Sequence, residues 1–189
     1  MNNKEDLRII KTKNTLRDTL INLMKDKQFE EIKVADICNN AIINRSTFYA
    51  HYTDKYELLV DLINSLKINL LNDLEKNKNI VNTREYYIEL IKLLLNHITE
   101  KNDIYTKVFL NNHHGILMDI LTDSVLKDIN KRIKDTNLKT NGIPNDLFIK
   151  FYLGGITSIG IEYLNNKTKY SEEEILSYIN NLIPKDIGI

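Results

Sequence analysis

The stretch that most limits how this chain can fold runs from Val34 to Tyr52 and reads VADICNNAIINRSTFYAHY. Its first apolar residues recur at helical spacing, which predicts a short helix over 34–40. Asn44 is an expected N-cap, because its side-chain oxygen can accept a hydrogen bond from a free N–H group two or three residues on. A second short helix is therefore expected over 45–51, joined to the first by a tight turn.

The expected second helix displays polar side chains rather than an apolar face. Its only apolar members are Phe48 and Ala50. A helix this short is unstable alone in water, so neighbouring elements must hold it rigidly. Its polar side chains belong to Arg45, Ser46, Thr47, Tyr49 and His51. This arrangement is typical of a helix-turn-helix, whose second helix enters the major groove of DNA.

The rest of the chain is expected to form long helices, since only two prolines and six glycines occur in 189 residues. Asp54 is a further expected cap, and Ser171 with Glu174 forms the capping-box pattern that starts the last helix. No pattern typical of a β-strand occurs, so the predicted fold class is all-α. The other expected helices cover residues 7–27, 55–76, 84–101, 103–110, 116–134, 146–164 and 171–183.

Bulk composition narrows the class of protein. Hydrophobic residues make up 42% and charged residues 28% of the chain, which argues against disorder. The formal net charge is zero, so a DNA-binding hypothesis rests on local geometry alone. The single cysteine excludes an intrachain disulfide and fits a reducing cytoplasm. The N-terminus has no signal-type apolar run, and the uncharged stretch 151–161 is too short to span a bilayer. We therefore expect a cytoplasmic protein without a membrane partner.

Three segments carry a resemblance to a known family. The segment FEEIKVADICNNAIINRSTFYAHYTDKYELL, residues 29–59, resembles the tetracycline-repressor (TetR) family of transcriptional regulators. The later segments FYLGGITSIGIEYL and YSEEEI resemble the subgroup that includes activators of dihydroxyacetone-kinase operons. The resemblance implies a three-helix helix-turn-helix domain over 1–54. It also implies a C-terminal bundle of about six helices over 55–189, which serves dimerisation and effector binding.

The resemblance also implies which residues contact double-stranded DNA. Lys55 would contact a phosphate through its charge and through the dipole of the helix that it begins. Lys33 stands where the family commonly has Thr, and Ile42 stands in the turn where the family often has Gly. The full set of expected DNA contacts is Lys33, Asn44, Arg45, Ser46, Thr47, Tyr49, His51 and Lys55.

In the family, the last two helices of each protomer form a four-helix dimer interface, and the C-terminal domain often holds an effector. The effector can be a small molecule or, in the activator subgroup, a protein. The expected interface residues are Phe148, Phe151, Tyr152, Gly155 and Ile159. Candidate pocket residues are Tyr86, Tyr87, Tyr105, Phe109 and Tyr152, for which an ordinary place in the core is an equal alternative.

The sequence gives little support for redox sensing, metal binding or catalysis. Cys38 is interpreted as a buried apolar residue rather than a redox sensor. The pair His113 and His114 is interpreted as part of a polar turn, because no Cys or carboxylate stands at metal-ligand spacing. No nucleophile–base pair and no Gly-rich phosphate loop occur, so we expect no metal, no cofactor and no enzymatic activity.

The prediction from sequence is therefore a homodimeric DNA-binding transcriptional regulator that binds a palindromic operator through helix 45–51. Repression is the default sign of regulation. The alternatives are a transcriptional activator controlled by a partner protein, and a helical interaction protein that does not bind DNA.

Overall fold

The computed structural model describes residues 2–75, 83–100, 104–112, 114–133, 142–166 and 169–183. Within these residues the chain forms nine α-helices, one short 3-10 helix and no strand, which confirms the all-α class. The elements are α1 (Asn2–Met24), η1 (Phe29–Glu31), α2 (Val34–Ala41), α3 (Arg45–Tyr49), α4 (Lys55–Glu75), α5 (Thr83–Glu100), α6 (Ile104–Asn111), α7 (Ile116–Ile133), α8 (Asn145–Asn165) and α9 (Glu172–Leu182).

The expected capping residues set two of the helix starts. Asp54 Oδ1 accepts hydrogen bonds from the backbone N–H groups of Tyr56 and Glu57, at 2.8 and 2.9 Å. Ser171 and Glu174 form the reciprocal capping box, with bonds of 2.8 and 3.2 Å. Each cap satisfies N–H groups that have no partner within the helix, so α4 and α9 begin where the sequence predicts.

Three helix boundaries differ by two or more residues from the sequence prediction. α1 begins at Asn2 rather than near residue 7 and ends at Met24 rather than at residue 27, and α3 ends at Tyr49 rather than at His51. Lys4 and Glu5 have good helix propensity, so the helix can extend before residue 7 without an apolar face. The end of α3 is a tight turn in which the N–H groups of His51 and Tyr52 both bond to the carbonyl of Phe48.

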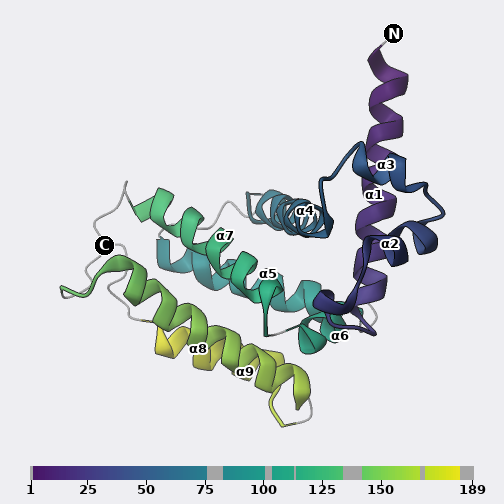
Figure 1. The fold of residues 1–189 in the computed structure, drawn as a ribbon. Coiled ribbons are helices and arrows are strands. Elements are labelled where there is room, and N and C mark those ends of the chain that lie inside the picture. Colours follow the sequence, from purple (N-terminus) through teal and green to yellow (C-terminus); the bar gives the residue numbers. More distant parts are fainter. Residues whose placement is uncertain are drawn as a thin grey trace.

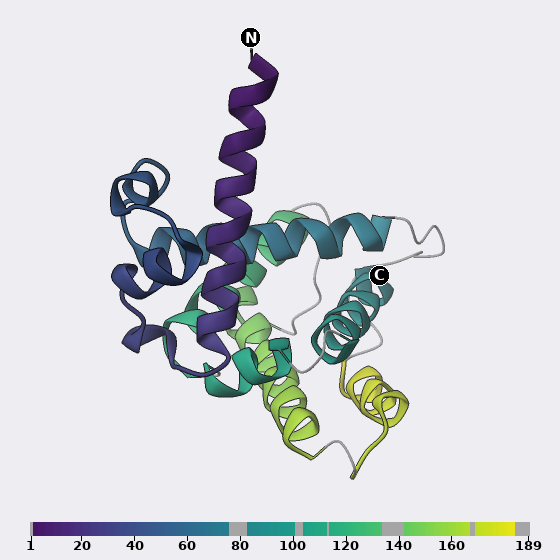
Figure 2. The same cartoon turned by 90° about the vertical axis from the view of Figure 1, so that its right-hand side faces the viewer.

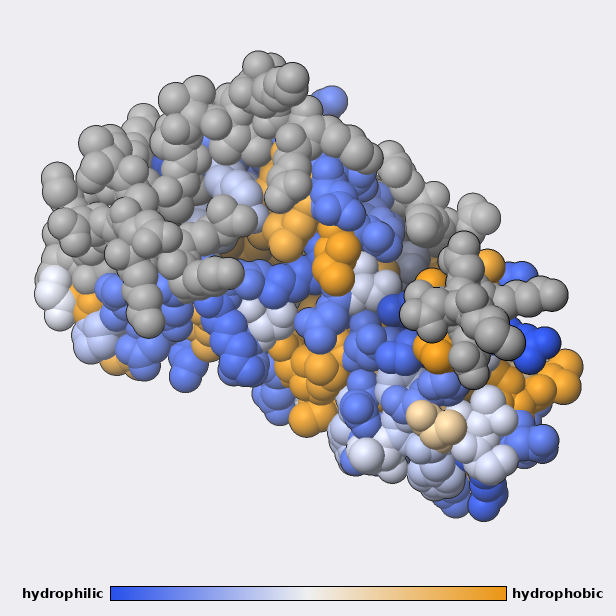
Figure 3. Space-filling view, turned by 90° about the horizontal axis from the view of Figure 1, so that it is seen from above, coloured by the Kyte–Doolittle hydropathy of each residue, from blue (hydrophilic) through white to orange (hydrophobic). Residues whose placement is uncertain are grey.

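The helices form an N-terminal group and a C-terminal group. α2 and α3 lie beside α1, and α4 leads from this group to the helices α5–α9 (Figure 1). The first turns of α1 extend beyond the other helices (Figure 2). Seen from above, the apolar side chains form separate patches between polar ones (Figure 3).

The larger hydrophobic core, called the first core here, joins the two groups. It contains buried residues of α1 to α4, together with Val108 of α6 and Leu117 of α7. It therefore crosses the expected boundary between residues 54 and 55. Its buried members are Leu16, Leu20, Ile21, Met24, Phe29, Ile32, Ile37, Cys38, Phe48, Tyr52, Leu58, Leu59, Leu62, Ile63, Val108 and Leu117.

A smaller second core lies between α5, α8 and α9. Its buried members are Leu95, Tyr163, Leu164, Ile175, Ile179 and Ile183. Arg84 at the start of α5 links α5 to the end of α9, because its guanidinium donates to the carbonyls of Asn180 and Ile183. These carbonyls lie at the end of α9 and have no partner further along the helix.

Candidate nucleic-acid interface

The short helix α3 is held by one fully buried side chain. Phe48 is 0% exposed, and its ring centroid lies 5.5 Å from that of Tyr49 and 5.8 Å from that of Tyr52. Aromatic rings at these distances and tilted geometries attract one another in addition to the area they bury. α3 is thus fixed by the first core, as its length requires.

The opposite face of α3 is open to solvent. Arg45, Ser46 and the preceding Asn44 are exposed, and the Tyr49 side chain is 56% exposed. Thr47 is half-buried. A rigid helix thus presents a guanidinium, a hydroxyl, an amide and a phenol on one surface, and these are groups that read base edges and phosphates.

Two expectations for this motif need correction. Asn44 stands at the N-cap position with an extended backbone, but its side chain makes no capping bond. The first-turn N–H groups of such a short exposed helix can instead bond to water. His51 lies beyond the end of α3 and is half-buried, so it belongs to the following turn rather than to the recognition helix.

The turn between α2 and α3 contains the strained residue that the sequence suggested. Ile42 has φ 55° and ψ 46°, and its side chain is 92% exposed. Next to it, the N–H of Ile43 bonds to the carbonyl of Cys38 at 3.0 Å, which ends α2 with the left-handed turn that glycine usually makes. A β-branched residue in this conformation costs free energy and gains no burial in return.

Lys55, for which a phosphate contact was expected, is bonded within the protein. Its Nζ donates to the carbonyls of Phe29, Glu30 and Ile32 at 2.9, 2.8 and 2.8 Å. A lysine ammonium has three donors, so all are used within the protein. Desolvation lowers the Lys55 pKa, and the charge of Glu30 opposes that shift.

The backbone start of α4 is occupied as well. The Asp54 carboxylate already bonds to the N–H groups of Tyr56 and Glu57. A negative group at this position also opposes the approach of a phosphate. Lys33 remains available, because its side chain is exposed and its bonds, such as that of its N–H to Asp36 at 2.9 Å, are made by its backbone. Of the two expected lysine contacts, the geometry favours Lys33.

A polar cluster that the sequence did not reveal fixes α4 to the helix-turn-helix. The Tyr52 hydroxyl donates to Asp61 at 2.7 Å, and Arg17 of α1 lies 3.4 Å from the same carboxylate. Lys13 lies 5.2 Å from the centre of the Tyr52 ring. Burial, with the bond to Asp61, raises the Tyr52 pKa, so the hydroxyl stays protonated as a donor. No local pattern relates these residues, which come from three elements.

The expected dimer residues occupy different environments on α8. Phe151 is 75% exposed and Gly155 is exposed. Phe148 and Tyr152 are half-buried, and their tilted rings lie 4.8 Å apart between centroids. Ile159 packs against the second core. By length and composition alone α8 could cross a membrane, and only 22% of its apolar window is buried inside the structure. A large part of its apolar surface is therefore uncovered in the single chain.

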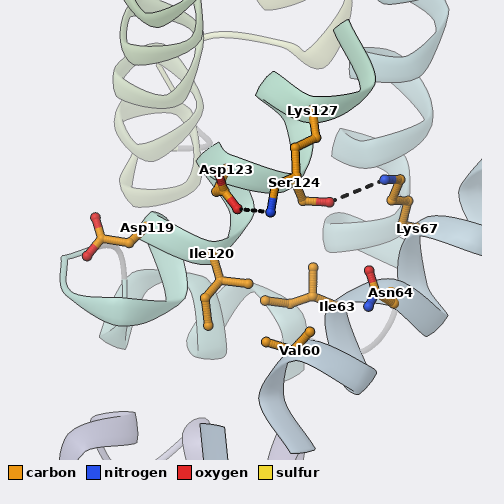
Figure 4. A pocket seen from close by; sticks show the side chains of 9 residues that line it. All are labelled: Val60, Ile63, Asn64, Lys67, Asp119, Ile120, Asp123, Ser124 and Lys127. Carbon is orange, nitrogen blue, oxygen red and sulfur yellow. Dashed lines mark hydrogen bonds and ion pairs between the residues drawn. The ribbon is translucent and has the colours of Figure 1, made fainter. Parts of the chain in front are cut away.

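A groove of about 450 Å³ lies between α4 and α7. Its floor is apolar, with Val60, Ile63 and Ile120, and its rim is charged (Figure 4). Lys67 of α4 bonds across the groove to Ser124 of α7 at 3.3 Å. The remaining lining residues are Asn64, Asp119, Asp123 and Lys127.

None of the five expected pocket residues lines this groove. Tyr86 and Tyr87 of α5 pack against each other, at 5.3 Å between ring centroids. Tyr105 lies 4.8 Å from the ring of His97, and Phe109 packs against the second core. Tyr152 of α8 packs against the rings of its own helix neighbours, Phe148 and Phe151. Their role in ligand binding stays a prediction.

The single cysteine and the histidines give no sign of redox or metal chemistry. Cys38 is 2% exposed, and burial raises the pKa of its thiol, against the smaller effect of Arg45. A buried thiol with a raised pKa is a poor nucleophile. In the part of the chain that the structure describes, no three His, Cys, Asp or Glu side chains lie together as metal ligands. His113 lies outside the described residues.

A helix-turn-helix motif followed by a larger helical domain is an arrangement typical of transcriptional regulators. Residues 85–185, more than half of the chain, match the TetR family model described as "Transcriptional regulator C-terminal region". The chain therefore belongs to the TetR family of transcriptional regulators.

Comparison with individual proteins agrees with this assignment. The chain is 27% identical over 175 residues to the "HTH-type dhaKLM operon transcriptional activator DhaS" of Lactococcus lactis, covering 88% of this chain and 86% of that protein. It is 36% identical over 59 residues to the uncharacterized HTH-type regulator YxbF of Bacillus subtilis, which is 31% of this chain and 16% of that protein. A TetR regulator structure from Streptococcus agalactiae has the same fold, with a TM-score of 0.68, 23% identity, and coverage of 96% and 98% of the two chains.

Proposed function

We propose that this TetR-family chain acts as a homodimer that binds a two-fold-symmetric DNA operator through α3, and that an effector in its C-terminal domain modulates the affinity. One observation carries the DNA-binding part of the proposal. α3 is fixed by a fully buried Phe48 and presents Arg45, Ser46 and Tyr49 to solvent. Rigid donors on one exposed face are what direct readout of the major groove requires.

Within this proposal the side chains have distinct tasks. Arg45 and Ser46 would meet base edges, and Tyr49 would contact a phosphate or a thymine methyl group. Lys33 would neutralise a phosphate on one side of the groove. Lys55 would not touch DNA, but would hold the main chain that carries α2.

The dimer part of the proposal rests on the uncovered face of α8 and α9. Leu147 and Phe151 of α8 are 56% and 75% exposed, and Leu182 of α9 is 60% exposed. At Gly154 and Gly155 a Cβ would meet nothing within 4 Å, so the helix offers room for close approach by another helix. Exposed apolar patches of this kind mark association surfaces. A second copy would cover this face and place two copies of α3 about 34–36 Å apart or at a multiple of that distance.

The groove between α4 and α7 supports the effector part of the proposal. Its apolar floor and charged rim suit a small polar molecule rather than a long acyl chain. α4 also carries Asp61, which bonds to Tyr52 of the helix-turn-helix. A ligand that separates α4 from α7 would thus act directly on the helix that holds the DNA-binding region.

The sign of regulation has two candidates. Repression is the default, because a dimer seated on an operator competes with polymerase for the same DNA. Activation is favoured by similarity to DhaS, whose name describes an operon transcriptional activator. In that case the effector could be a partner protein. A promoter fusion measured with and without the gene separates the two.

The test is footprinting on DNA upstream of the gene and of its neighbours, across a salt series. We expect a protected site with two-fold symmetry and an affinity that falls steeply as salt rises. Arg45→Ala should weaken binding by about 10-fold to 100-fold, the usual cost of losing a bidentate base contact, and should relax the sequence preference at one position in each half-site.

A matched control and a contrary outcome complete the test. Lys92→Ala removes an exposed cation from α5, far from α3, and should leave binding unchanged. Absence of protection at low salt, both with purified protein and in cell extract, would contradict the proposal. It would favour the alternative of a helical interaction protein that does not bind DNA.

A further inference from the structure

The segment that joins α1 to α2 is held by a buried asparagine from the C-terminal group. Asn112, which follows α6, is 2% exposed. Its Nδ2 donates to the carbonyls of Met24 at 3.1 Å and Val108 at 2.9 Å, and its Oδ1 accepts from the N–H of Phe29 at 2.7 Å. One side chain thus connects the end of α1, the start of η1 and the last turn of α6.

Two flanking contacts join the same pair of segments. Asn111 donates to the carbonyl of Lys25 at 2.6 Å, and the Glu30 carboxylate accepts from the N–H of Ile116 at 3.2 Å, the first residue of α7. Gly115 has φ +86°, and a Cβ there would lie 2.6 Å from Glu30 Oε1. The positive φ favours glycine at this position, and a Cβ there would displace the Glu30 carboxylate from its place beside Ile116.

The same segment is held from the other side by α4. Lys55 donates to the carbonyls of Phe29, Glu30 and Ile32. The main chain of η1 is thus bonded at once to the beginning of α4 and to the turn between α6 and α7. We call these contacts, made by Asn111, Asn112, Glu30 and Lys55, the clasp.

The clasp differs in kind from the apolar contacts around it. Leu and Ile side chains can slide against one another at small cost, whereas hydrogen bonds fix distance and direction. Because Asn112 is buried, any shift of α6 relative to η1 would leave the N–H of Phe29 or the carbonyl of Met24 without a partner. The turn between α6 and α7 therefore has one preferred position relative to η1.

We propose that Asn112 is a positioning residue that fixes the orientation of the helix-turn-helix relative to the C-terminal domain. Through it, a movement of α6 or α7 becomes a movement of α3. The consequence for operator recognition rests on the proposed function, but the orientation itself does not. The clasp is the joint through which an effector-induced shift would reach DNA.

The first experiment measures orientation without DNA. Spin labels on Asn39→Cys in α2 and Lys92→Cys in α5, in a Cys38→Ala background, report the distance between the two groups by electron–electron resonance. Labelled protein is diluted with unlabelled protein, so that distances within one chain dominate. The unmodified clasp should give one narrow distribution. Asn112→Ala should at least double its width, and Glu30→Ala, which removes an exposed contact, should give a smaller increase.

Controls separate positioning from loss of stability. Asn166→Ala removes an asparagine bond remote from the clasp and should leave the width unchanged. Circular dichroism shows whether Asn112→Ala is folded. If it is not, the width of the distance distribution in Glu30→Ala alone decides the proposal. An unchanged width in the folded variant overturns the proposal, even if its melting temperature falls.

The second experiment measures the consequence for DNA. Binding is compared on an operator and on the same operator with one base pair inserted between its half-sites. The unmodified protein should bind the original operator much more tightly than the lengthened one. Asn112→Ala should reduce the ratio of these two affinities about tenfold. Equal discrimination by both proteins counts against the proposal. If the unmodified protein binds no operator, the proposed function fails, while the distance measurement still decides the role of Asn112.

Discussion

The helix-turn-helix region and the α8–α9 hairpin differ in how completely a single chain buries them. Phe29, Phe48 and Leu58 in the first core are 0% exposed, whereas Phe151 of α8 is 75% exposed and Leu182 of α9 is 60% exposed. The first region is fully packed within one chain, and this packing makes α3 rigid. The second has a packed inner face and an apolar outer face, which in our proposal is covered by another copy of the chain.

In the proposed function, the difference matches what each region has to do. A recognition helix must hold a few side chains within a narrow range of positions against base edges, so its support must be complete before DNA arrives. An interface helix must keep its apolar side chains available until the partner binds. The same hydrophobic effect thus serves folding at Phe48 and, in our proposal, association at Phe151.

The largest expected effect is on the first core. Phe29→Ala should lower the free energy of unfolding by about 3–5 kcal/mol, because it leaves a cavity at a fully buried site and removes the ring beside Lys55. Urea unfolding followed by circular dichroism measures this loss. Phe151→Ala is the matched control and, measured at protein concentrations below the dissociation constant of the dimer, should change the stability of a single chain very little. Similar losses for the two variants would mean that the contrast between the regions is wrong.

The next effect is on association. Phe151→Asp should weaken the dimer about 100-fold, because a charge on a face that becomes buried must be desolvated. Sedimentation over a range of protein concentrations measures the dissociation constant. Asn145→Asp adds the same charge at an exposed position on the same helix and should leave the dissociation constant unchanged. A dimer that survives Phe151→Asp would show that another surface mediates association.

A third prediction separates the two lysines. Lys55→Met should lower the free energy of unfolding by about 2 kcal/mol, since three carbonyls lose a charged donor. It should leave the salt dependence of DNA binding unchanged. Lys33→Met should do the reverse, with little loss of stability and a salt slope reduced by about one. A reduced salt slope for Lys55→Met would restore its role as a phosphate contact.

The smallest expected effect is a gain in stability. Ile42→Gly should stabilise the protein by about 1 kcal/mol, because it relieves a left-handed β-branched residue whose side chain is 92% exposed. A rise of about 2–4 °C in melting temperature is expected for a chain of this size. Ile42→Val keeps the strain and should give no gain. A loss of stability in the glycine variant would mean that the turn depends on the isoleucine side chain.

Much of the fold was predictable from local sequence. Apolar spacing located the helices, and the caps at Asp54 and Ser171 located two of their starts. Burial of Cys38 and Phe48 was expected from their position in the motif. Ile42 was expected to make the turn depart from the left-handed one that glycine forms, but its backbone keeps the αL conformation. These are local features, because each depends on residues within one or two helical turns.

The functional details that the sequence missed are non-local. Lys55 was expected to face a phosphate, but its partners lie 23 to 26 residues earlier in the chain. Asn112 was part of a predicted polar turn, but its partners Met24 and Phe29 lie 88 and 83 residues away. No pattern in a short window can reveal such contacts, since tertiary packing alone brings these segments together. The groove between α4 and α7 was missed for the same reason.

The most direct test of the account locates α3 on DNA. An iron chelate attached to Ser46→Cys, in a Cys38→Ala background, cleaves DNA only where α3 lies close to it. We expect two clusters of cleavage related by two-fold symmetry, with centres about one helical turn apart or at a multiple of that spacing. The same chelate at Lys92→Cys should cleave nothing. Absence of cleavage from Ser46→Cys on a protected operator would show that α3 is not the recognition helix and would contradict the account.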